Sequence, residues 1–198
     1  MSKEKFDILE STCVPLPLDN VDTDQIIPAR FLSATSREGF GDNLFRDWRY
    51  DKSGQSVTEF ALNNPKYTGK VLVAGKNFGS GSSREHAVWA IFDYGFRVVV
   101  SSFFADIFKN NALNNGLLPV VVPEKFLRDL LYLIEKKPET IVRIDLENQL
   151  FTVLATARSF TFEVNPYKKE CLLKGLDDIE YLLGIKDLII SFETKKRV

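Results

Sequence analysis

The sequence has few residues of the kinds that bind metals. Its 198 residues include one histidine, His86, and two cysteines, Cys13 and Cys171, which lie far apart in the chain. These residues cannot make a four-ligand zinc site without carboxylates, and the sequence has no CxxC or HxxxH spacing. An iron–sulfur cluster takes several cysteines, so we expect no metal bound by this chain alone. Two distant cysteines also form no disulfide framework, and we expect a reducing, cytoplasmic location.

The sequence also has no excess of positive or negative charge and no long apolar run. The chain has 26 Lys and Arg against 27 Asp and Glu, a net charge of −1, whereas nucleic-acid-binding domains carry a basic patch. No apolar run approaches the ~20 residues of a membrane-spanning helix, and residues 1–10 lack the apolar centre of a signal peptide. We therefore expect a soluble globular chain with no nucleic-acid or membrane partner. Its length suffices for a hydrophobic core without disulfide or metal staples.

The spacing of apolar residues predicts an α/β fold in one domain, residues 1–198. Strands and helices alternate between residues 70 and 137, and this order is typical of a parallel sheet. Strand-like runs after residue 140 predict an antiparallel addition, which gives a mixed sheet core flanked by helices. The expected strands are 6–13, 70–74, 97–101, 117–122, 141–146, 150–155 and 160–164, and the expected helices are 83–94, 103–110, 124–137 and 177–183.

Residues 33–67 form a long segment without a clear period. The segment is polar and aromatic, is interrupted by Gly39, Gly41, Gly54 and Pro65, and has room for short helices near 43–48 and 57–62. A loop of this length inside a compact domain is usually functional. We therefore expect an excursion from the domain that serves the function.

The most informative segment is residues 75–87, GKNFGSGSSREHA, at a predicted strand–loop–helix junction. A helix N-terminus offers unpaired backbone N–H groups and a partial positive charge, which suit an anion. Glycines let the backbone approach that anion, and the Arg84 guanidinium matches a carboxylate or phosphate. Two nucleotide-binding motifs are absent. The dinucleotide fingerprint needs Gly or Ala where this loop has Arg84, and a Walker A loop counted from Gly75 needs Gly where this loop has Ser80.

Several residues of this segment allow more than one interpretation. Ser82 and Glu85 have the spacing of a capping box, and from spacing alone we favour a helix cap over catalysis for Ser82. Arg84 in the first helical turn opposes the helix dipole, so it indicates an anionic ligand, although a nearby carboxylate would also explain it. A single histidine on a helix, as His86 is, is more often a hydrogen-bonded structural residue than a catalyst.

The acidic cluster around Asp22 and Asp24 invites comparison with a calcium loop, and the comparison fails. An EF-hand begun at Asn20 needs Gly at its sixth position and Glu at its twelfth, where this chain has Gln25 and Phe31. We expect instead that the aspartates form turns by bonding to their own backbone.

Four segments together resemble a known family. Residues 22–28 (DTDQIIP), 77–87 (NFGSGSSREHA), 102–108 (SFFADIF) and 116–119 (GLLP) occur in the order found in the swivelling domain of the aconitase superfamily, here as a separate small subunit. The resemblance covers nearly the whole chain, and the serine–arginine motif is highly specific. Residues 40–50 (FGDNLFRDWRY) are similar to the leucine-pathway members of the superfamily.

The resemblance implies a swivelling β/β/α domain and a hydro-lyase. In this superfamily a hydroxy-dicarboxylate loses water and regains it with the hydroxyl on the neighbouring carbon, through an alkene. A [4Fe–4S] cluster held by cysteines of a large subunit acts as a Lewis acid on the leaving hydroxyl, so a large-subunit partner is implied. In this chain the resemblance implies Ser82 as the catalytic base, helped by Arg84.

The resemblance also implies substrate-binding residues. Ser83 and Arg84 would bind the substrate carboxylates, and Asp24 matches the family's aspartate in register. The family's arginine matches either Arg30 or Arg37, and we favour Arg37 because it enters the 33–67 loop. That loop would face the substrate, and its apolar residues could contact an apolar group or only pack the loop: Phe31, Leu32, Phe40, Leu44 and Phe45.

Two rival functions stay open on the sequence. One is the small subunit of a related hydro-lyase, such as homoaconitase or a methyl-substituted malate dehydratase. The other is a non-catalytic anion-binding module, in which Ser82 would only cap a helix.

Overall fold

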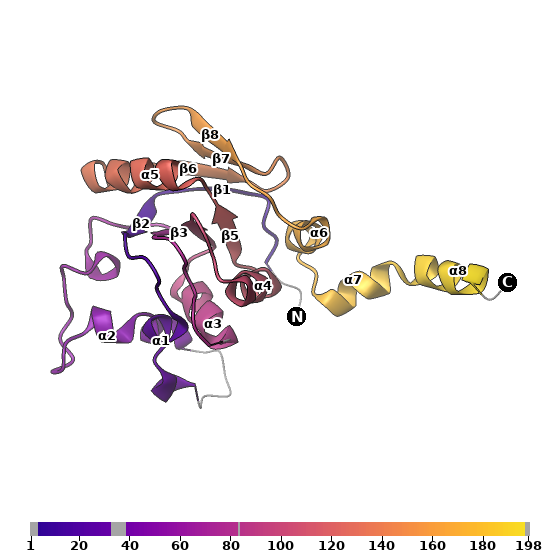
Figure 1. Ribbon diagram of the computed structural model, residues 1–198, viewed down its shortest axis with the longest axis horizontal. Coiled ribbons are helices and arrows are strands. Elements are labelled where there is room, and N and C mark those ends of the chain that lie inside the picture. The colour runs from indigo at the N-terminus through magenta and orange to yellow at the C-terminus, as the bar shows by residue number, and fades with distance from the viewer. Residues whose placement is uncertain (1–3, 33–38, 83, 197–198) are drawn as a thin grey trace.

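The computed structural model describes residues 4–32, 39–82 and 84–196, and its strands form two four-stranded sheets (Figure 1). The parallel sheet has the order β2 (Cys13–Leu16), β3 (Val71–Ala74), β4 (Val98–Ser101) and β5 (Leu118–Val121). The antiparallel sheet has the order β1 (Ile8–Ser11), β6 (Val142–Asp145), β7 (Leu150–Val153) and β8 (Arg158–Thr161). The α/β class, with a parallel core and an antiparallel addition, is thus confirmed.

Alternate residues of the parallel strands face two separate hydrophobic cores. In β3, Val71 and Val73 belong to the core shared with α5 (Glu124–Lys136) and the antiparallel sheet. Leu72 and Ala74 belong to the core shared with α3 (Glu85–Tyr94), because successive strand residues point to opposite faces. Figure 1 shows the result, with α5 and the antiparallel sheet on one side of the parallel sheet and α3 on the other.

Two long helices begin and end close to their predicted positions. Helix α3 ends at Gly95, whose left-handed backbone (φ 118°) makes the C-cap, and α5 ends at Lys136, before Pro138. No helix within the described residues is long and apolar enough to cross a membrane. The remaining helical segments are α1 (Thr23–Ile26), α2 (Arg46–Arg49), α4 (Asp106–Asn114), α6 (Pro166–Lys174), α7 (Asp178–Gly184), α8 (Lys186–Lys196) and the 3-10 helices Ala29–Phe31, Phe40–Asn43 and Ala61–Asn63.

One predicted helix start was wrong, and two helices were not predicted. Helix α4 begins at Asp106 rather than near residue 103, because Phe104 forms a strand-like bridge with Phe78 and the Ala105 N–H donates to the Phe78 carbonyl (3.2 Å). Helices α6 and α8 were not predicted. Only Cys171 and Leu172 of α6 are buried, so its sequence carries a weak apolar period.

The predicted strand 6–13 is divided between the two sheets. β1 alternates exposed and half-buried residues and pairs antiparallel with β6, whereas all four residues of β2 are buried and pair in parallel with β3. The chain passes from one sheet to the other at Thr12, whose hydroxyl donates to the Thr68 carbonyl (2.6 Å). One continuous stretch of sequence therefore supplies a strand to each of the two sheets.

Residues 39–67 pack against α3 instead of standing apart from the domain. Phe40, Leu44 and Phe45 are at most 2% exposed and belong to the α3 core. Gly41 permits the close approach, since a Cβ there would lie 2.6 Å from the backbone N of Tyr94. For these three apolar residues the packing interpretation is confirmed, and contact with a substrate is excluded.

The carboxyl ends of the parallel strands lie at one edge of the sheet, where ligands of such sheets commonly bind. The loop after β3 is hydrogen-bonded there to the loops after its two neighbours. The Gly75 N–H donates to the Leu16 carbonyl (3.0 Å), and the Phe78 N–H to the Phe103 carbonyl (3.1 Å). The fold thus gathers the motif-bearing loops at one place.

We expect Gly79→Ala to lower the free energy of unfolding more than Gly54→Ala. Both glycines have left-handed backbones (φ 76° and 82°), but a Cβ at Gly79 would lie 2.2 Å from Cγ of Phe108, while one at Gly54 meets nothing within 4 Å. The left-handed backbone costs an alanine about 1–2 kcal/mol at either site, and the collision adds roughly 1–3 kcal/mol at Gly79 alone. Urea unfolding measures both; equal losses would contradict close packing of the loop on α4.

Candidate functional site

Two segments that are far apart in the sequence meet at this edge: the aspartate segment (residues 19–24) and the serine loop (residues 75–84). Asp22 and Ser80 form a parallel bridge, and the Thr23 N–H donates to the Ser80 carbonyl (2.9 Å). The two motifs that carry the family resemblance therefore form one structural unit, fixed by backbone hydrogen bonds.

Two aspartates of the aspartate segment bond to backbone N–H groups: Asp22 to its own local backbone, as predicted, and Asp19 to a distant segment, which was not predicted. Asp22 caps α1: its carboxylate accepts from the Gln25 N–H (2.8 Å), and the Gln25 side chain accepts from the Asp22 N–H (2.8 Å). The Asp19 carboxylate accepts from the Lys76 N–H (2.7 Å) and ties the segment to the serine loop. These two carboxylates shape the site rather than act in it.

Thr23 holds the backbone of Ser82. The Thr23 side chain is 3% exposed, and its hydroxyl donates to the Ser82 carbonyl (2.8 Å). Ser82 itself is exposed, and within the described ranges nothing hydrogen-bonds its hydroxyl. The arrangement fixes the main chain of Ser82 and keeps the hydroxyl available to a ligand.

Arg84 forms an ion pair with Asp24 across the two segments. The Arg84 side chain is 17% exposed and that of Asp24 is 55% exposed. The contact uses one guanidinium nitrogen, Nη1, and a guanidinium carries five N–H donors. The sequence analysis offered a nearby carboxylate as one explanation of an arginine at a helix start, and Asp24 is that carboxylate. The ion pair orients Arg84 and leaves guanidinium N–H groups that can bind an anion.

Ser82 and Arg84 line a cavity of about 270 Å³ between the starts of α3 and α4. The first turns of two helices border it, and each contributes partial positive charge toward an anion. Its volume is just below the ~300–1,000 Å³ of typical small-molecule sites, as expected of a site that a second surface completes. The other lining residues are Thr23, Gly79, Gly81, Ala105, Asp106, Ile107 and Phe108.

The capping-box interpretation of Ser82 and Glu85 was wrong. The N-cap residue of α3 is Arg84, and no side chain hydrogen-bonds to the helix start from that position. The Ser82 carbonyl is engaged by Thr23, and the loop reaches the helix through glycines with left-handed backbones at Gly79 and Gly81. Ser82 therefore lies before the helix, on the cavity side.

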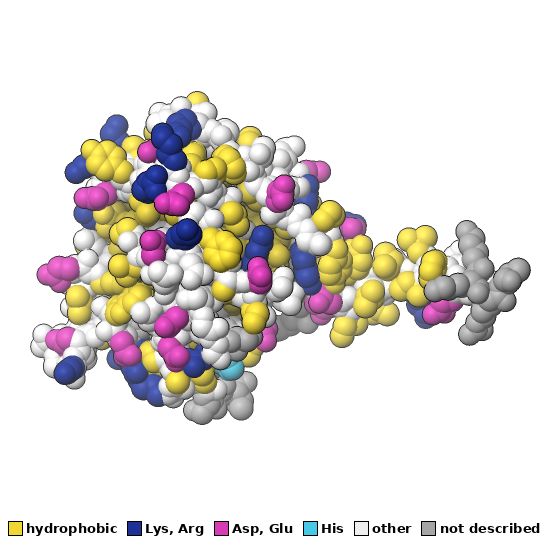
Figure 2. All heavy atoms as spheres, in the orientation of Figure 1, with side chains coloured by type: hydrophobic (Ala, Val, Ile, Leu, Met, Phe, Trp, Pro, Cys, Tyr) yellow, Lys and Arg dark blue, Asp and Glu magenta, His cyan; other side chains and the backbone are white. Residues whose placement is uncertain are grey.

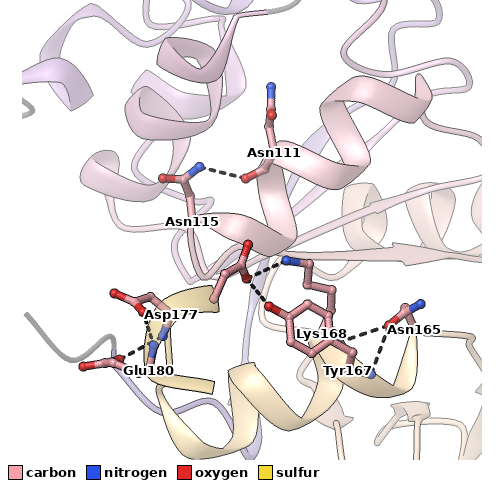
Figure 3. Close-up of polar contacts among 8 residues, drawn as sticks. Asn111, Asn115, Asn165, Tyr167, Lys168, Asp177 and Glu180 are labelled. Atoms are coloured by element: carbon pink, nitrogen blue, oxygen red, sulfur yellow. Dashed lines mark hydrogen bonds and ion pairs between the residues drawn. The ribbon is translucent and has the colours of Figure 1, made fainter. Parts of the chain in front are cut away.

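Glu85 instead joins a hydrogen-bond network that ties α3 to α4. The Asn115 amide donates to the Glu85 carboxylate (2.8 Å) and to the Asn111 carbonyl (2.8 Å), and it accepts from the Trp89 indole N–H (3.0 Å). Figure 3 shows the Asn111–Asn115 part of the network. The network therefore ties the start of α3, beside the cavity, to the C-terminal end of α4.

The structure places the other predicted site residues as follows. Ser83 and Arg37 lie outside the described residues. Arg30 pairs with Asp47 (Nη1 to Oδ2, 3.0 Å), which lowers the pKa of Asp47, and it does not line the cavity. His86 lies against the Trp89 ring, with the ring centroids 4.6 Å apart.

Five cavity residues outside the serine loop were missed by the sequence reasoning: Thr23, Ala105, Asp106, Ile107 and Phe108. Thr23 was hidden because its role is a long-range hydrogen bond to the Ser82 backbone. Asp106, Ile107 and Phe108 form the first turn of α4, and the sequence signal for them was present. They lie in the segment 102–108, whose resemblance to the superfamily is as good as that of the serine loop.

The described residues do not fit an iron–sulfur cluster. Cys13 is in β2 and Cys171 in α6, and both are buried. Burial raises the pKa of the Cys13 thiol, which disfavours the thiolate that binds metals. Across residues 4–32, 39–82 and 84–196, no three His, Cys, Asp or Glu side chains converge as metal ligands. A cluster at this site needs ligands from elsewhere.

A larger hollow, of about 450 Å³, lies between β2, the 59–67 segment and α5. Its lining is mainly apolar, including Leu18, Phe60 and Tyr132, with carboxylates at Glu59 and Glu135. No arginine or serine lines it, so it offers nothing to bind a dicarboxylate. The smaller cavity at the serine loop remains the candidate site.

Known proteins are similar to this chain over most of its length. The aconitase C-terminal domain family matches residues 3–125. Three bacterial relatives named 3-isopropylmalate dehydratase small subunit match nearly full length. Those from Azobacteroides pseudotrichonymphae (96% of this chain, 97% of the relative), Cytophaga hutchinsonii (96% and 94%) and Lactococcus lactis (97% and 98%) are 61%, 57% and 48% identical.

A solved structure is similar as well. The crystal structure of 3-isopropylmalate dehydratase from Methanocaldococcus jannaschii superposes with a TM-score of 0.65 at 31% identity. The match covers 94% of this chain and 99% of that chain.

We expect Asn115→Ala to destabilise the protein by about 1–3 kcal/mol, because it removes two hydrogen bonds to α3 and one within α4 at a site that is 7% exposed. Asn110→Ala, at an exposed position of the same helix, should change stability by at most ~0.5 kcal/mol. Thermal and urea unfolding measure both variants. Equal effects would show that the network does not hold the two helices together.

Proposed function

Because the chain belongs to the aconitase superfamily and, within it, to the family of 3-isopropylmalate dehydratase small subunits, we propose that Ser82 is its catalytic base. The enzyme is a hydro-lyase that converts 2-isopropylmalate to 3-isopropylmalate through 2-isopropylmaleate. The observation that carries the proposal is the open Ser82 hydroxyl, on a fixed backbone, in a cavity beside Arg84.

The reaction needs a base for one proton bound to carbon. Ser82, as the alkoxide, takes this proton; the C–H electron pair forms the C=C bond, and hydroxide leaves the neighbouring carbon. Water then adds in the opposite sense. Its hydroxyl goes to the carbon that lost the proton, and Ser82 returns its proton to the carbon that lost the hydroxide. A serine hydroxyl is mostly protonated at neutral pH, so this role needs nearby positive charge. The Arg84 guanidinium and the start of α3 supply it.

Arg84 binds a substrate carboxylate in this proposal. Its planar guanidinium matches a carboxylate with two parallel hydrogen bonds, and Asp24 keeps it on the cavity side. Asp24 is itself an anion beside a dianionic substrate, so the structure favours orienting Arg84 over direct contact. Ser83 and Arg37 stay proposed carboxylate ligands on the family resemblance.

The apolar branch of the substrate needs an apolar contact on this chain. Phe40, Leu44 and Phe45 are closed off in the α3 core. Ile107 lines the cavity and is 53% exposed, and Ala105 lies beside it. We therefore assign the contact with the isopropyl group to Ile107, at the start of α4.

The family is one of small subunits, so this chain acts with a large subunit. The finer proposal is that the large subunit closes the cavity and holds a [4Fe–4S] cluster by its own cysteines. When bound, such a cluster supplies a Lewis acid for the leaving hydroxyl. This chain, as one domain, supplies the base and the carboxylate and isopropyl contacts, in the cytoplasm, where its thiols stay reduced.

We expect Ser82→Ala to lower kcat about 100-fold or more, the usual contribution of a general base, with little change in KM. The measurement is alkene absorbance on 2-isopropylmalate, using both subunits with the cluster reconstituted without oxygen. Ser80→Ala is the matched control, because Ser80 belongs to the same loop and does not line the cavity.

Retained turnover in Ser82→Ala would remove the base assignment. A wild-type chain that forms no complex and shows no turnover after successful reconstitution would instead favour an anion-binding module.

We expect Ile107→Ala to raise KM for 2-isopropylmalate roughly tenfold, the effect of losing about one methylene-sized contact with the substrate in a hydrophobic site, ~1–3 kcal/mol. KM for a malate with a methyl branch should change less, because that branch is too short to reach the same contact. The ratio of the two KM values tests the assignment. An equal rise for both substrates would mean that Ile107 shapes the cavity without contacting the branch.

A further inference from the structure

The backbone hydrogen bonds that hold the serine loop end two residues before Ser82. The Ser80 N–H donates to the Val21 carbonyl (3.2 Å), and the Ser80 carbonyl accepts from the Thr23 N–H (2.9 Å). Among the described residues, no backbone group bonds to the main chain of Gly81 or Ser82. Ser82 therefore lies beyond the part of the loop that the neighbouring backbone holds in place.

The Thr23 hydroxyl supplies the restraint that the backbone does not. Ser82 is exposed and follows Gly81, whose left-handed backbone (φ 89°) is a conformation that glycine adopts without strain. Neither packing nor main-chain bonds would keep Ser82 in one position. Within the described ranges, the Thr23 hydroxyl is the one protein group that bonds to Ser82, by donating to its carbonyl (2.8 Å).

Thr23 is itself firmly held. It opens α1, which buries Thr23 and Ile26 and turns its polar residues to solvent. Figure 2 shows acidic and basic side chains side by side over this part of the surface. The Asp22 capping box closes the start of α1, and the carbonyl of Ile26, which is 0% exposed, accepts from the Phe45 N–H (2.8 Å) of the α3 core. A fixed turn thus carries the hydroxyl that restrains Ser82.

The first turn of α1 also holds Arg84. Thr23 and Asp24 are neighbours in this turn; Thr23 bonds to Ser82, and Asp24 pairs with Arg84. The turn therefore sets the distance from the proposed base to the guanidinium that binds the substrate. This distance matters for proton transfer, because reacting atoms must lie about 3–3.5 Å apart and a misplacement of ~1 Å can cost roughly 100-fold in rate.

We propose that Thr23 is a positioning residue for the reaction: its hydroxyl fixes the backbone of Ser82 so that the Ser82 oxygen meets the substrate held by Arg84. The proposal rests on the proposed function, which makes Ser82 the base. Thr23 transfers no proton in the reaction, since its hydroxyl proton is used in the bond to the Ser82 carbonyl. A threonine that served folding alone would affect stability and leave turnover unchanged.

The test is turnover of 2-isopropylmalate by both subunits, with the cluster reconstituted without oxygen. Thr23→Val keeps the shape of the side chain and removes the hydroxyl. We expect kcat to fall about 10- to 100-fold, the cost of misplacing a reacting group by up to ~1 Å, with little change in KM. Thr23→Ser keeps the hydroxyl and should recover kcat nearly to the wild-type value.

The double variant Thr23→Val/Ser82→Ala separates positioning from other roles. If Thr23 acts through Ser82, its hydroxyl has nothing left to position once the Ser82 hydroxyl is gone. The double variant should then equal Ser82→Ala in kcat/KM. A further loss of about tenfold, the size expected for an independent contact worth ~1.4 kcal/mol, would overturn the proposal and show that Thr23 contacts the substrate directly.

Thr140→Val is the matched control. Thr140 is 4% exposed, against 3% for Thr23, and its hydroxyl also donates to a carbonyl, that of Lys137 (2.6 Å). It follows α5, which lies on the opposite side of the parallel sheet from α3 (Figure 1). Urea unfolding should show similar losses of stability in Thr140→Val and Thr23→Val, and Thr140→Val should keep the wild-type kcat and KM.

Two results would overturn the proposal in distinguishable ways. Wild-type kcat in Thr23→Val, beside an inactive Ser82→Ala, removes the positioning role and leaves the base assignment standing. Retained turnover in Ser82→Ala removes the base assignment, and the positioning role falls with it. Should Thr23→Val not fold, Thr23→Ala removes the same hydroxyl without placing a methyl group against the Ser82 carbonyl, and the same comparisons apply to it.

Discussion

The site depends on backbone hydrogen bonds between the aspartate segment and the serine loop. Thr23 makes two of the contacts: its N–H donates to the Ser80 carbonyl, and its hydroxyl donates to the Ser82 carbonyl. These bonds hold the aspartate segment against the serine loop. Without this pairing, Asp24 would not meet Arg84, and the Ser82 backbone would have no fixed position. The parallel order of β2 and β3 makes the pairing possible, since both segments leave the sheet at the same edge.

The spacing of apolar residues and the helix-ending residues predicted the parallel core, because both patterns lie within short segments of the sequence. The apolar run 70–74 became β3, and the apolar face of residues 124–137 became α5, closed before Pro138. The same rules misplaced Ser82, since its spacing to Glu85 satisfies a capping box in isolation. What prevented the cap is tertiary: Thr23 engages the Ser82 backbone and Asn115 engages Glu85. Contacts between distant segments override a local preference here.

The choice between packing and ligand contact for the 33–67 apolar residues was also beyond local rules. Phe45 and Ile107 are both apolar and both lie in motif-like segments, yet Phe45 is fully buried and Ile107 is half exposed at the cavity. The difference comes from the close approach of Gly41 to α3, which closes the core over Phe40 and its neighbours. A sequence shows which residues are apolar; the fold decides which of them remain accessible.

The apolar surface that the fold leaves open indicates what the chain lacks. Two cores use most of the apolar residues; one of them includes Cys13, and Cys171 is buried on α6, so neither thiol is exposed to a metal. The apolar residues left exposed include Ile107 at the cavity, Phe103 just before α4, and several along α7 and α8. A domain that can already fold on two cores gains nothing in stability from apolar residues in water. The large subunit proposed above would cover the cavity where Ile107 is exposed, and it would also bring the metal ligands that the described residues of this chain do not supply.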